Sequence, residues 1–167
     1  MGIVDITGIS EDVTNIVDFM DNVLQRIIDT FESANVPLPA RQYWTVGQGA
    51  LDCEQLVLAL IQIYLGPPGD QASSPQRCNM PRTAVMTVTV AREIPVIGQN
   101  GRPPSADKIS QAAQISAIDA YTLMQAINLL DVWDEGGPGP GVIATADIGE
   151  PQGGFQTVSL QLTMAIP

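Results

Sequence analysis

The chain contains no histidine and a single lysine, Lys108, among its 167 residues. Histidine is the commonest general base near neutral pH and the commonest protein ligand of transition metals. Its absence therefore excludes the catalytic and metal sites that depend on it. Positive charge is scarce as well, because seven Lys and Arg residues stand against 18 Asp and Glu, a net charge of −11. Binding to nucleic-acid phosphates or anionic membranes needs clustered cations, so the composition predicts neither partner.

Long apolar runs and paired cysteines are also missing. The longest apolar run, residues 56–65, is interrupted by Gln62, whereas about 20 apolar residues are needed to span a bilayer. The N-terminus lacks the basic and apolar segments of a signal peptide, so we expect cytoplasmic synthesis and no membrane partner. Cys53 and Cys78 form no CxxC pair, and reducing conditions favour free thiols. A disulfide tying the loop 66–81 to a sheet is the alternative.

The length suits one domain, residues 1–167, with a core large enough to need no metal or disulfide scaffold. Hydrophobic residues make up 45% of the chain and charged residues only 15%. Few charges must therefore cover the surface, and we expect part of it to be buried between subunits. The prolines and glycines lie between the periodic segments, which indicates ordered elements joined by rigid turns.

Two long helices are predicted from apolar periodicity. Residues 11–34 carry one apolar stripe and an acidic opposite face, with Ser10 as the N-cap and Asn35 in a left-handed C-cap. The second helix begins after Ser105 and reaches about residue 132. Its predicted inward stripe consists of Ile109, Ala112, Ala113, Ser116, Ala117, Ala120, Leu123, Met124, Ile127 and Leu130.

Small residues on that stripe predict close packing, so a bulky residue at Ala117 or Ala120 should overpack the contact. Three further apolar residues, Ile115, Ile118 and Tyr121, lie off the stripe. They predict a second buried face on this helix, which a neighbouring subunit would supply.

The remaining periodic segments read as strands. Residues 42–46 are aromatic and β-branched, and 83–92 alternate between apolar and polar side chains. Residues 51–65 predict a strand covered on both faces and antiparallel to 83–92, with a helix as the alternative. Residues 142–148 and 155–165 predict a hairpin. The sum is an α+β fold, a mainly antiparallel β-sheet with two long helices packed against it in the order α-β-β-β-α-β-β.

No pattern of catalytic residues emerges. The glycines of residues 47–49 lack the third glycine of a dinucleotide loop, and Cys53, between Asp52 and Glu54, has no histidine to activate it. The acidic clusters 18–29 and 131–135 do not match a calcium loop. We therefore predict no enzyme, no catalytic residues, no cofactor and no metal. A hydrolase using a pair of carboxylates is the remaining enzymatic alternative.

Several segments resemble tail terminator proteins of siphophages that infect actinobacteria. They are residues 50–57 (ALDCEQLV), 62–69 (QIYLGPPG), 78–82 (CNMPR) and 92–96 (REIPV), and the resemblance extends over roughly residues 10–135. Tail terminators are α+β proteins that form hexameric rings. They cap the tail tube, stop its elongation and offer a docking surface for the head connector.

The resemblance implies a structural virion protein of the tail and neck, assembled in the host cytoplasm. Its implied partners are further copies of itself, the tail tube protein and a head–tail connector or stopper protein. Genomic DNA would pass through an acidic lumen without specific binding, because like charges repel. Another head–tail connector, a tail tube protein and a monomeric binding module are the alternatives.

The resemblance carries no catalytic residue, and it implies interface loops rather than single positions. The Gly- and Pro-rich stretches 66–81, 97–104 and 135–141 are the candidate loops. Arginines in or beside loops could pair with a neighbouring subunit's carboxylates; these are Arg41, Arg77, Arg82, Arg92 and Arg102. The candidate interface residues are Pro67, Pro68, Asp70, Arg77, Arg82, Arg102, Asp134 and Glu135.

Overall fold

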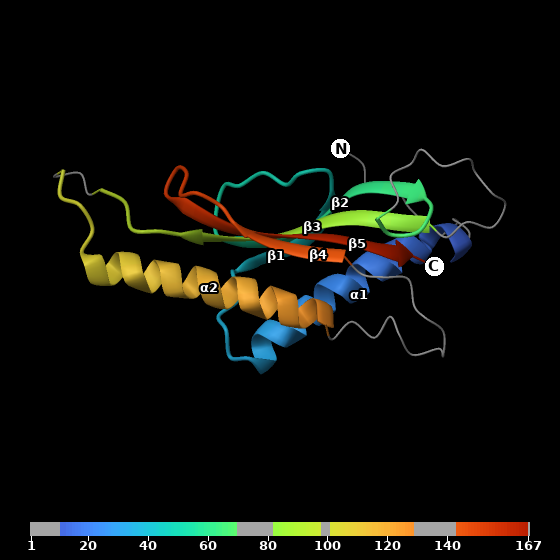
Figure 1. The fold of residues 1–167 in the computed structure, drawn as a ribbon, viewed down its shortest axis with the longest axis horizontal. Helices are drawn as coiled ribbons and strands as arrows, with labels where there is room; N and C mark the ends of the chain where they lie inside the picture. The colour runs from blue at the N-terminus through green and yellow to red at the C-terminus, as the bar shows by residue number, and fades with distance from the viewer. Residues whose placement is uncertain (1–10, 70–81, 98–100, 129–142, 167) are drawn as a thin grey trace.

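The computed structural model describes residues 11–69, 82–97, 101–128 and 143–166 (Figure 1). The elements follow the predicted order α-β-β-β-α-β-β, and the α+β fold is confirmed. They are α1 (Glu11–Ser33), β1 (Arg41–Val46), β2 (Gln55–Leu65), β3 (Arg82–Glu93), α2 (Ala106–Asn128), β4 (Ile143–Ile148) and β5 (Phe155–Ile166).

The strands form one five-stranded sheet in the order β1-β2-β3-β5-β4. The expected antiparallel pairing of β2 with β3 and the expected β4–β5 hairpin are both confirmed. Only β1 pairs in parallel, with β2. Both helices lie on the same face of the sheet, and the chain between β1 and β2 crosses the other face (Figure 1). We call these the helix face and the open face.

The core lies between the helix face and the two helices. Alternate residues of β3 and β5 point into it, because side chains alternate across a strand; Met86, Val88 and Val90 are fully buried while Thr87 and Thr89 lie half-buried on the open face. The helices contribute the fully or almost fully buried side chains Met20, Val23, Ile27, Phe31, Leu123, Ala126 and Ile127.

Helix α1 has the orientation and ends predicted from its pattern. Asn35 has a φ of 54°, the left-handed conformation expected for its C-cap. The amide of Val36 donates to the carbonyl of Phe31, and the amide of Asn35 to that of Glu32. These two bonds form a Schellman motif, which satisfies carbonyls that the helix leaves unpaired. Ser10 lies outside the described residues.

Strand β2 confirms the strand reading of its apolar run, but two details of the prediction were wrong. It begins at Gln55 rather than at residue 51, because residues 47–54 form the loop that crosses the open face. It is buried on both faces only as far as Leu60; Ile61, Ile63 and Leu65 are exposed. The covering loop and the helices protect only its first half.

The predicted inward stripe of α2 was partly wrong. Ile109, Ala113 and Ala117 are exposed, whereas Asp119 and Thr122 are buried. The first turns of α2 extend past the ends of the strands, so their side chains have no sheet to contact (Figure 1). Farther along, the helix is rotated so that Asp119 faces the sheet. Ala117 therefore cannot be overpacked as expected. Residues 129–132, the predicted end of this helix, lie outside the described residues.

Candidate functional site

The rotation of α2 is fixed by an ion pair with β3. Arg92 Nε and Nη2 donate to the two carboxylate oxygens of Asp119, and both bonds are 2.9 Å long. Nη2 also donates to the carbonyl of Pro37 at 2.6 Å. The Asp119 side chain is fully buried and that of Arg92 is only 12% exposed. This bidentate pair joins α2, β3 and the segment after α1, so α2 cannot rotate without leaving buried charges unpaired.

A second polar contact fixes α2 one turn earlier. The buried hydroxyl of Ser116 bonds the Gln156 side chain on β5 at 3.2 Å and the carbonyl of Ala112 at 3.1 Å. Gln156 in turn donates to the carbonyl of Gly149, which follows β4. Three polar side chains of α2, those of Ser116, Asp119 and Thr122, thus point inward, where they have partners.

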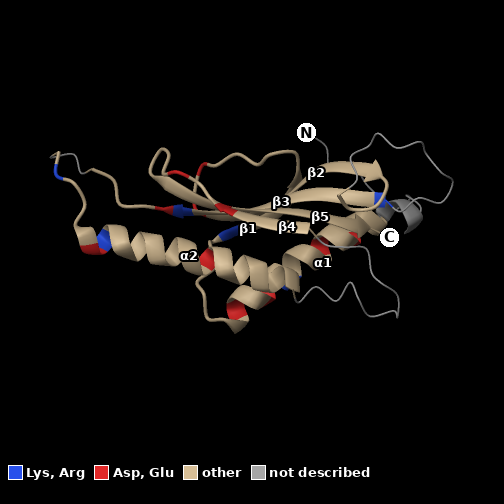
Figure 2. Cartoon of the chain, viewed as in Figure 1, with Lys and Arg blue, Asp and Glu red and all other residues tan. Residues whose placement is uncertain are grey.

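Several large apolar side chains of α2 are exposed instead. Ile109, Ile118 and Tyr121 are 53%, 49% and 67% exposed, and Ile115 is 39% exposed. From Ile109 to Asn128 the only charged residue is Asp119, which is buried, so the outer surface of this stretch has no charge. Figure 2 shows the contrast with α1, whose outer surface carries several acids. We call the uncharged surface that carries Ile115, Ile118 and Tyr121, with exposed glutamines between them, the outer face of α2.

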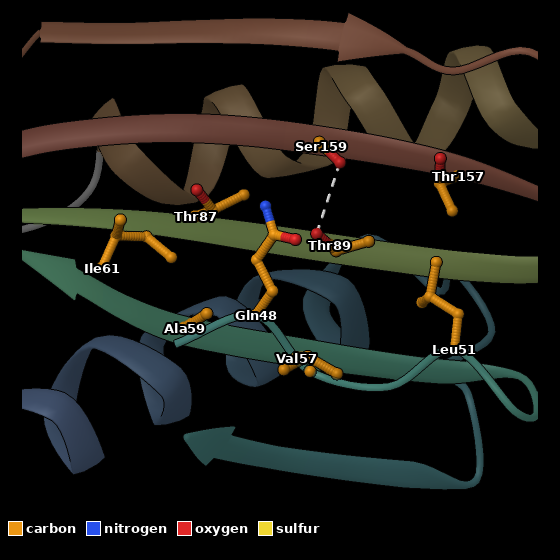
Figure 3. Close-up of a pocket in the computed structure, with 10 residues that line it drawn as sticks. Gln48, Leu51, Val57, Ala59, Ile61, Thr87, Thr89, Thr157 and Ser159 are labelled. Carbon is orange, nitrogen blue, oxygen red and sulfur yellow. Dashed lines mark hydrogen bonds between the residues drawn. The ribbon is translucent and has the colours of Figure 1, made fainter. Parts of the chain in front are cut away.

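The middle of the open face combines hydroxyl groups with apolar side chains and carries no charge. Gln48 and Leu51 of the crossing loop overlie it and enclose a hollow of about 220 Å³ (Figure 3). The hydroxyls of Thr89 and Ser159 lie 3.3 Å apart at its base. None of the ten residues lining this hollow has an ionisable side chain at neutral pH. It can accept or donate hydrogen bonds but offers no general acid or base.

The crossing loop approaches the sheet closely at Gly49. A Cβ atom there would lie 3.1 Å from Val57 Cγ1 and 3.3 Å from the hydroxyl of Tyr43, which is tighter than side chains normally pack. A glycine is therefore needed for the loop to cover β2 at this point. The Gly-Gln-Gly run that superficially suggested a nucleotide loop has a packing role.

Arg41 at the start of β1 contacts the Asp52–Cys53 pair singled out in the sequence. Its Nη1 lies 2.9 Å from Asp52 Oδ1 and 3.4 Å from the Cys53 sulfur, and its guanidinium stacks 5.3 Å from the Tyr43 ring. The thiol of Cys53 and then the guanidinium of Arg41 hold the pKa of Asp52 below its ordinary value of 3.8. Arg41 and Asp52 are both exposed, and their bond holds the end of the crossing loop, where β2 begins, beside the start of β1.

The candidate interface residues fall at opposite ends of the molecule. Pro67 and Pro68 follow β2, and Arg82 begins β3 directly opposite Leu65, so these three share one end of the sheet. Arg102 precedes α2 at the other end of the long axis (Figure 1). The structure therefore does not bring them into one surface. Asp70, Arg77, Asp134 and Glu135 lie outside the described residues, as do Cys78 and most of the loops 66–81 and 135–141.

Two arginines considered for pairing with a neighbouring subunit have partners within the chain. Arg92 binds the buried Asp119, and Arg41 binds Asp52. Apolar periodicity alone does not single out Asp119, because it reads α2 as an apolar stripe. One signal was available: Asp119 is the only charged residue between Lys108 and Asp131. A lone acid in a helix otherwise free of charge points to a buried cationic partner.

No model of a known protein family matches the chain, and no curated protein is similar to its sequence. Neither described helix is long and apolar enough to cross a membrane. Within the described residues, no three His, Cys, Asp or Glu side chains are grouped so that they could hold a metal ion. The surfaces above are therefore the basis for a functional proposal.

Proposed function

We propose that this chain is a structural virion protein, a tail terminator whose copies form a hexameric ring that caps the tail tube and joins it to the head connector. One structural observation carries the proposal: the outer face of α2 has no charge and exposes large apolar side chains, Ile118 and Tyr121 among them. The segments of residues 50–96 that resemble tail terminators support the same function.

The outer face of α2 indicates burial against another protein surface. Ile118 and Tyr121 each leave about half or more of their surface in water, although α2 as a whole is anchored firmly. Removing apolar surface from water stabilises an assembly by about 25 cal/mol per Å². Exposed large apolar side chains on a surface without charge are typical of a protein–protein contact. Contact between copies supplies that burial.

The acidic balance is compatible with DNA passing through such a ring. On α1, the exposed face carries Asp18, Asp21, Asp29 and Glu32. Carboxylates repel phosphates, so an acidic surface lets DNA move past without binding it. In this proposal DNA is transported cargo and makes no specific contact, and the protein performs no catalysis.

The proposal is tested by measuring the mass of the purified protein by light scattering and imaging it in negative stain. We expect a ring of about six subunits, either alone or after addition of purified tail tubes, and capping of the tube ends. A protein that stays monomeric in both conditions and leaves the tube ends uncapped would contradict the proposal.

Ile118→Glu tests the surface that carries the proposal. Because Ile118 is 49% exposed, the variant should fold, with a free energy of unfolding within about 0.5 kcal/mol of the parent. A carboxylate buried between copies is strongly unfavourable, so ring formation should be lost. Asn22→Glu adds the same charge to the exposed face of α1 and serves as the control. Rings that form normally with Ile118→Glu would show that this face is not buried in the assembly.

A further inference from the structure

The five-stranded sheet has two free edges of equal length. β1 pairs only with β2, and β4 pairs only with β5, so within the described residues each has one side without a strand neighbour. Both strands have six residues. Neither contains proline or lysine, the residues with which proteins commonly block an exposed edge. Free edges of this kind are templates for pairing with another strand.

Two hydrogen bonds show which residues of β1 and β4 turn their backbone N–H and C=O groups away from the sheet. The amide of Gly149 donates to the carbonyl of Thr157, which continues the β4–β5 ladder by one residue. Because bonded residues alternate, Ala144, Ala146 and Ile148 turn their N–H and C=O groups away from β5. The amide of Gly47 likewise donates to Leu60 on β2. The residues of β1 whose backbone N–H and C=O groups point away from β2 are therefore Gln42, Trp44 and Val46.

We propose that the free edge of β4 in one copy pairs with the free edge of β1 in the next copy, so that the sheets continue from subunit to subunit around the ring. This inference rests on the proposed function and specifies which surfaces meet. Following the pairings across the sheet, β4 runs antiparallel to β1. Two copies placed side by side in the same orientation thus form an antiparallel pair, the more stable kind.

The side-chain faces select the register. Ala144, Ala146 and Trp44 all pack against the core on the helix face. A register that keeps the helix faces of both copies on the same side must place these even-numbered residues opposite one another. Two such registers give five residue pairs each, and the one that also covers Val46 sets Ala146 opposite Trp44 and Ala144 opposite Val46. Val46 is 73% exposed in the single chain, and Trp44 and Val46 then each face an alanine.

Charge complementarity identifies a second copy as the partner strand. In the same register Asp147 lies opposite Tyr43 on the open face and diagonal to Arg41, within reach of a long side chain. Arg41 is one of only seven cations in the chain, and its side chain remains 53% exposed despite its bond to Asp52. The acid is thus on one edge and the cation on the other. This arrangement is a heterologous interface, which closes into a ring.

The helices would also meet in this arrangement. On a helix of 3.6 residues per turn, Ile115 and Ile118 lie on the side opposite Ala120 and Met124. Ala120 and Met124 pack against the core, and α2 contacts α1, β4 and β5. When the sheets are joined, α2 of one copy becomes the neighbour of α1 in the next. Ile115 and Ile118 can then be buried together with the strand pair.

A disulfide across the proposed pair tests its register. Thr45 and Thr145 lie opposite each other on the open face, as a pair without mutual hydrogen bonds, whose Cα separation suits a disulfide. We would combine Thr45→Cys and Thr145→Cys with Cys53→Ser and Cys78→Ser. After oxidation, a non-reducing gel should show a ladder reaching the hexamer. Val46→Cys with Thr145→Cys places the thiols on opposite faces, and this control should lose the ladder.

A proline on the β4 edge tests the backbone bonds directly. Ala146→Pro removes an outward N–H but no bond to β5, so the subunit should fold and the ring should be lost. Thr145→Pro removes an inward N–H and should instead destabilise the subunit. If parent rings form but neither the ladder nor the effect of Ala146→Pro appears, the edge pairing is wrong and the ring proposal stands. A ladder without closed rings or tube capping supports the pairing and contradicts the terminator function. A parent that remains monomeric contradicts both.

Discussion

Helices α1 and α2 have the same length, 23 residues, and cover the same face of the sheet, yet their outer surfaces differ in kind. The outer surface of α1 carries acids and amides, and its apolar stripe is buried on the opposite side. The outer surface of α2 carries isoleucines, a tyrosine and uncharged glutamines, and its one acid beyond the first turn is buried. Water suits the first helix, whereas the second exposes large apolar side chains that the proposed contact with another copy would cover.

The comparison shows that the inside of a helix and its outside are set by different requirements. In α1 both agree, because apolar residues point inward and charged residues outward. In α2 the inward positions include the polar Ser116, Asp119 and Thr122, each with a hydrogen-bond partner. Buried polar groups can be tolerated when they are paired. Polar residues inside and apolar residues outside are consistent with a helix placed between two protein surfaces.

The largest effect is expected where α2 is anchored. Asp119→Ala leaves Arg92 buried without its partner, and removing one member of a buried ion pair lowers the free energy of unfolding by about 3–5 kcal/mol. Asp29→Ala on the outer surface of α1 removes an exposed bond to Gln25 and should change it by less than about 0.5 kcal/mol. Urea denaturation of the two variants measures the difference.

The double variant Arg92→Met with Asp119→Leu tests whether the loss in Asp119→Ala comes from leaving Arg92 buried without a partner. Because both charges are removed together, it should recover most of the lost stability. Equal destabilisation by Asp119→Ala and Asp29→Ala would show that the ion pair does not hold α2 in place.

An intermediate effect distinguishes the two sides of α2. Ala126 is fully buried, so Ala126→Leu should overpack the core and lower the free energy of unfolding by about 1–3 kcal/mol. Ala117 is exposed, and Ala117→Leu should leave the stability of the subunit within about 0.5 kcal/mol of the parent. Thermal unfolding of both variants checks the rotation of the helix. A larger loss from Ala117→Leu would restore the stripe originally expected from the sequence.

The smallest effect concerns the end of α1. Asn35 adopts a left-handed conformation, which costs most residues about 1–2 kcal/mol but is tolerated by asparagine and glycine. Asn35→Ala should therefore destabilise the protein by about 1 kcal/mol, and Asn35→Gly should match or slightly exceed the parent. Chemical denaturation under identical conditions compares them. Identical stabilities for the alanine and glycine variants would contradict the C-cap.

The sequence by itself determined the order of the elements, the orientation of α1 and the alternation of β3 and β5. These depend on local periodicity and on caps, such as Asn35, whose effect is confined to neighbouring residues. It also predicted that Ile115, Ile118 and Tyr121 lie away from the inward stripe, and all three are exposed in the structure.

Only the tertiary structure decided how α2 is rotated, where β2 is exposed and which strands form the free edges. Periodicity does not orient α2, because its apolar side chains are not confined to one stripe and hydrophobic burial favours several rotations almost equally. The bidentate bond between Arg92 and Asp119 selects one of them, and its two residues lie 27 positions apart. The pairing of β1 with β2 and of β4 with β5 likewise depends on contacts between strands. Neither the rotation of α2 nor the free edges can be read from local sequence, since both arise only when distant residues meet.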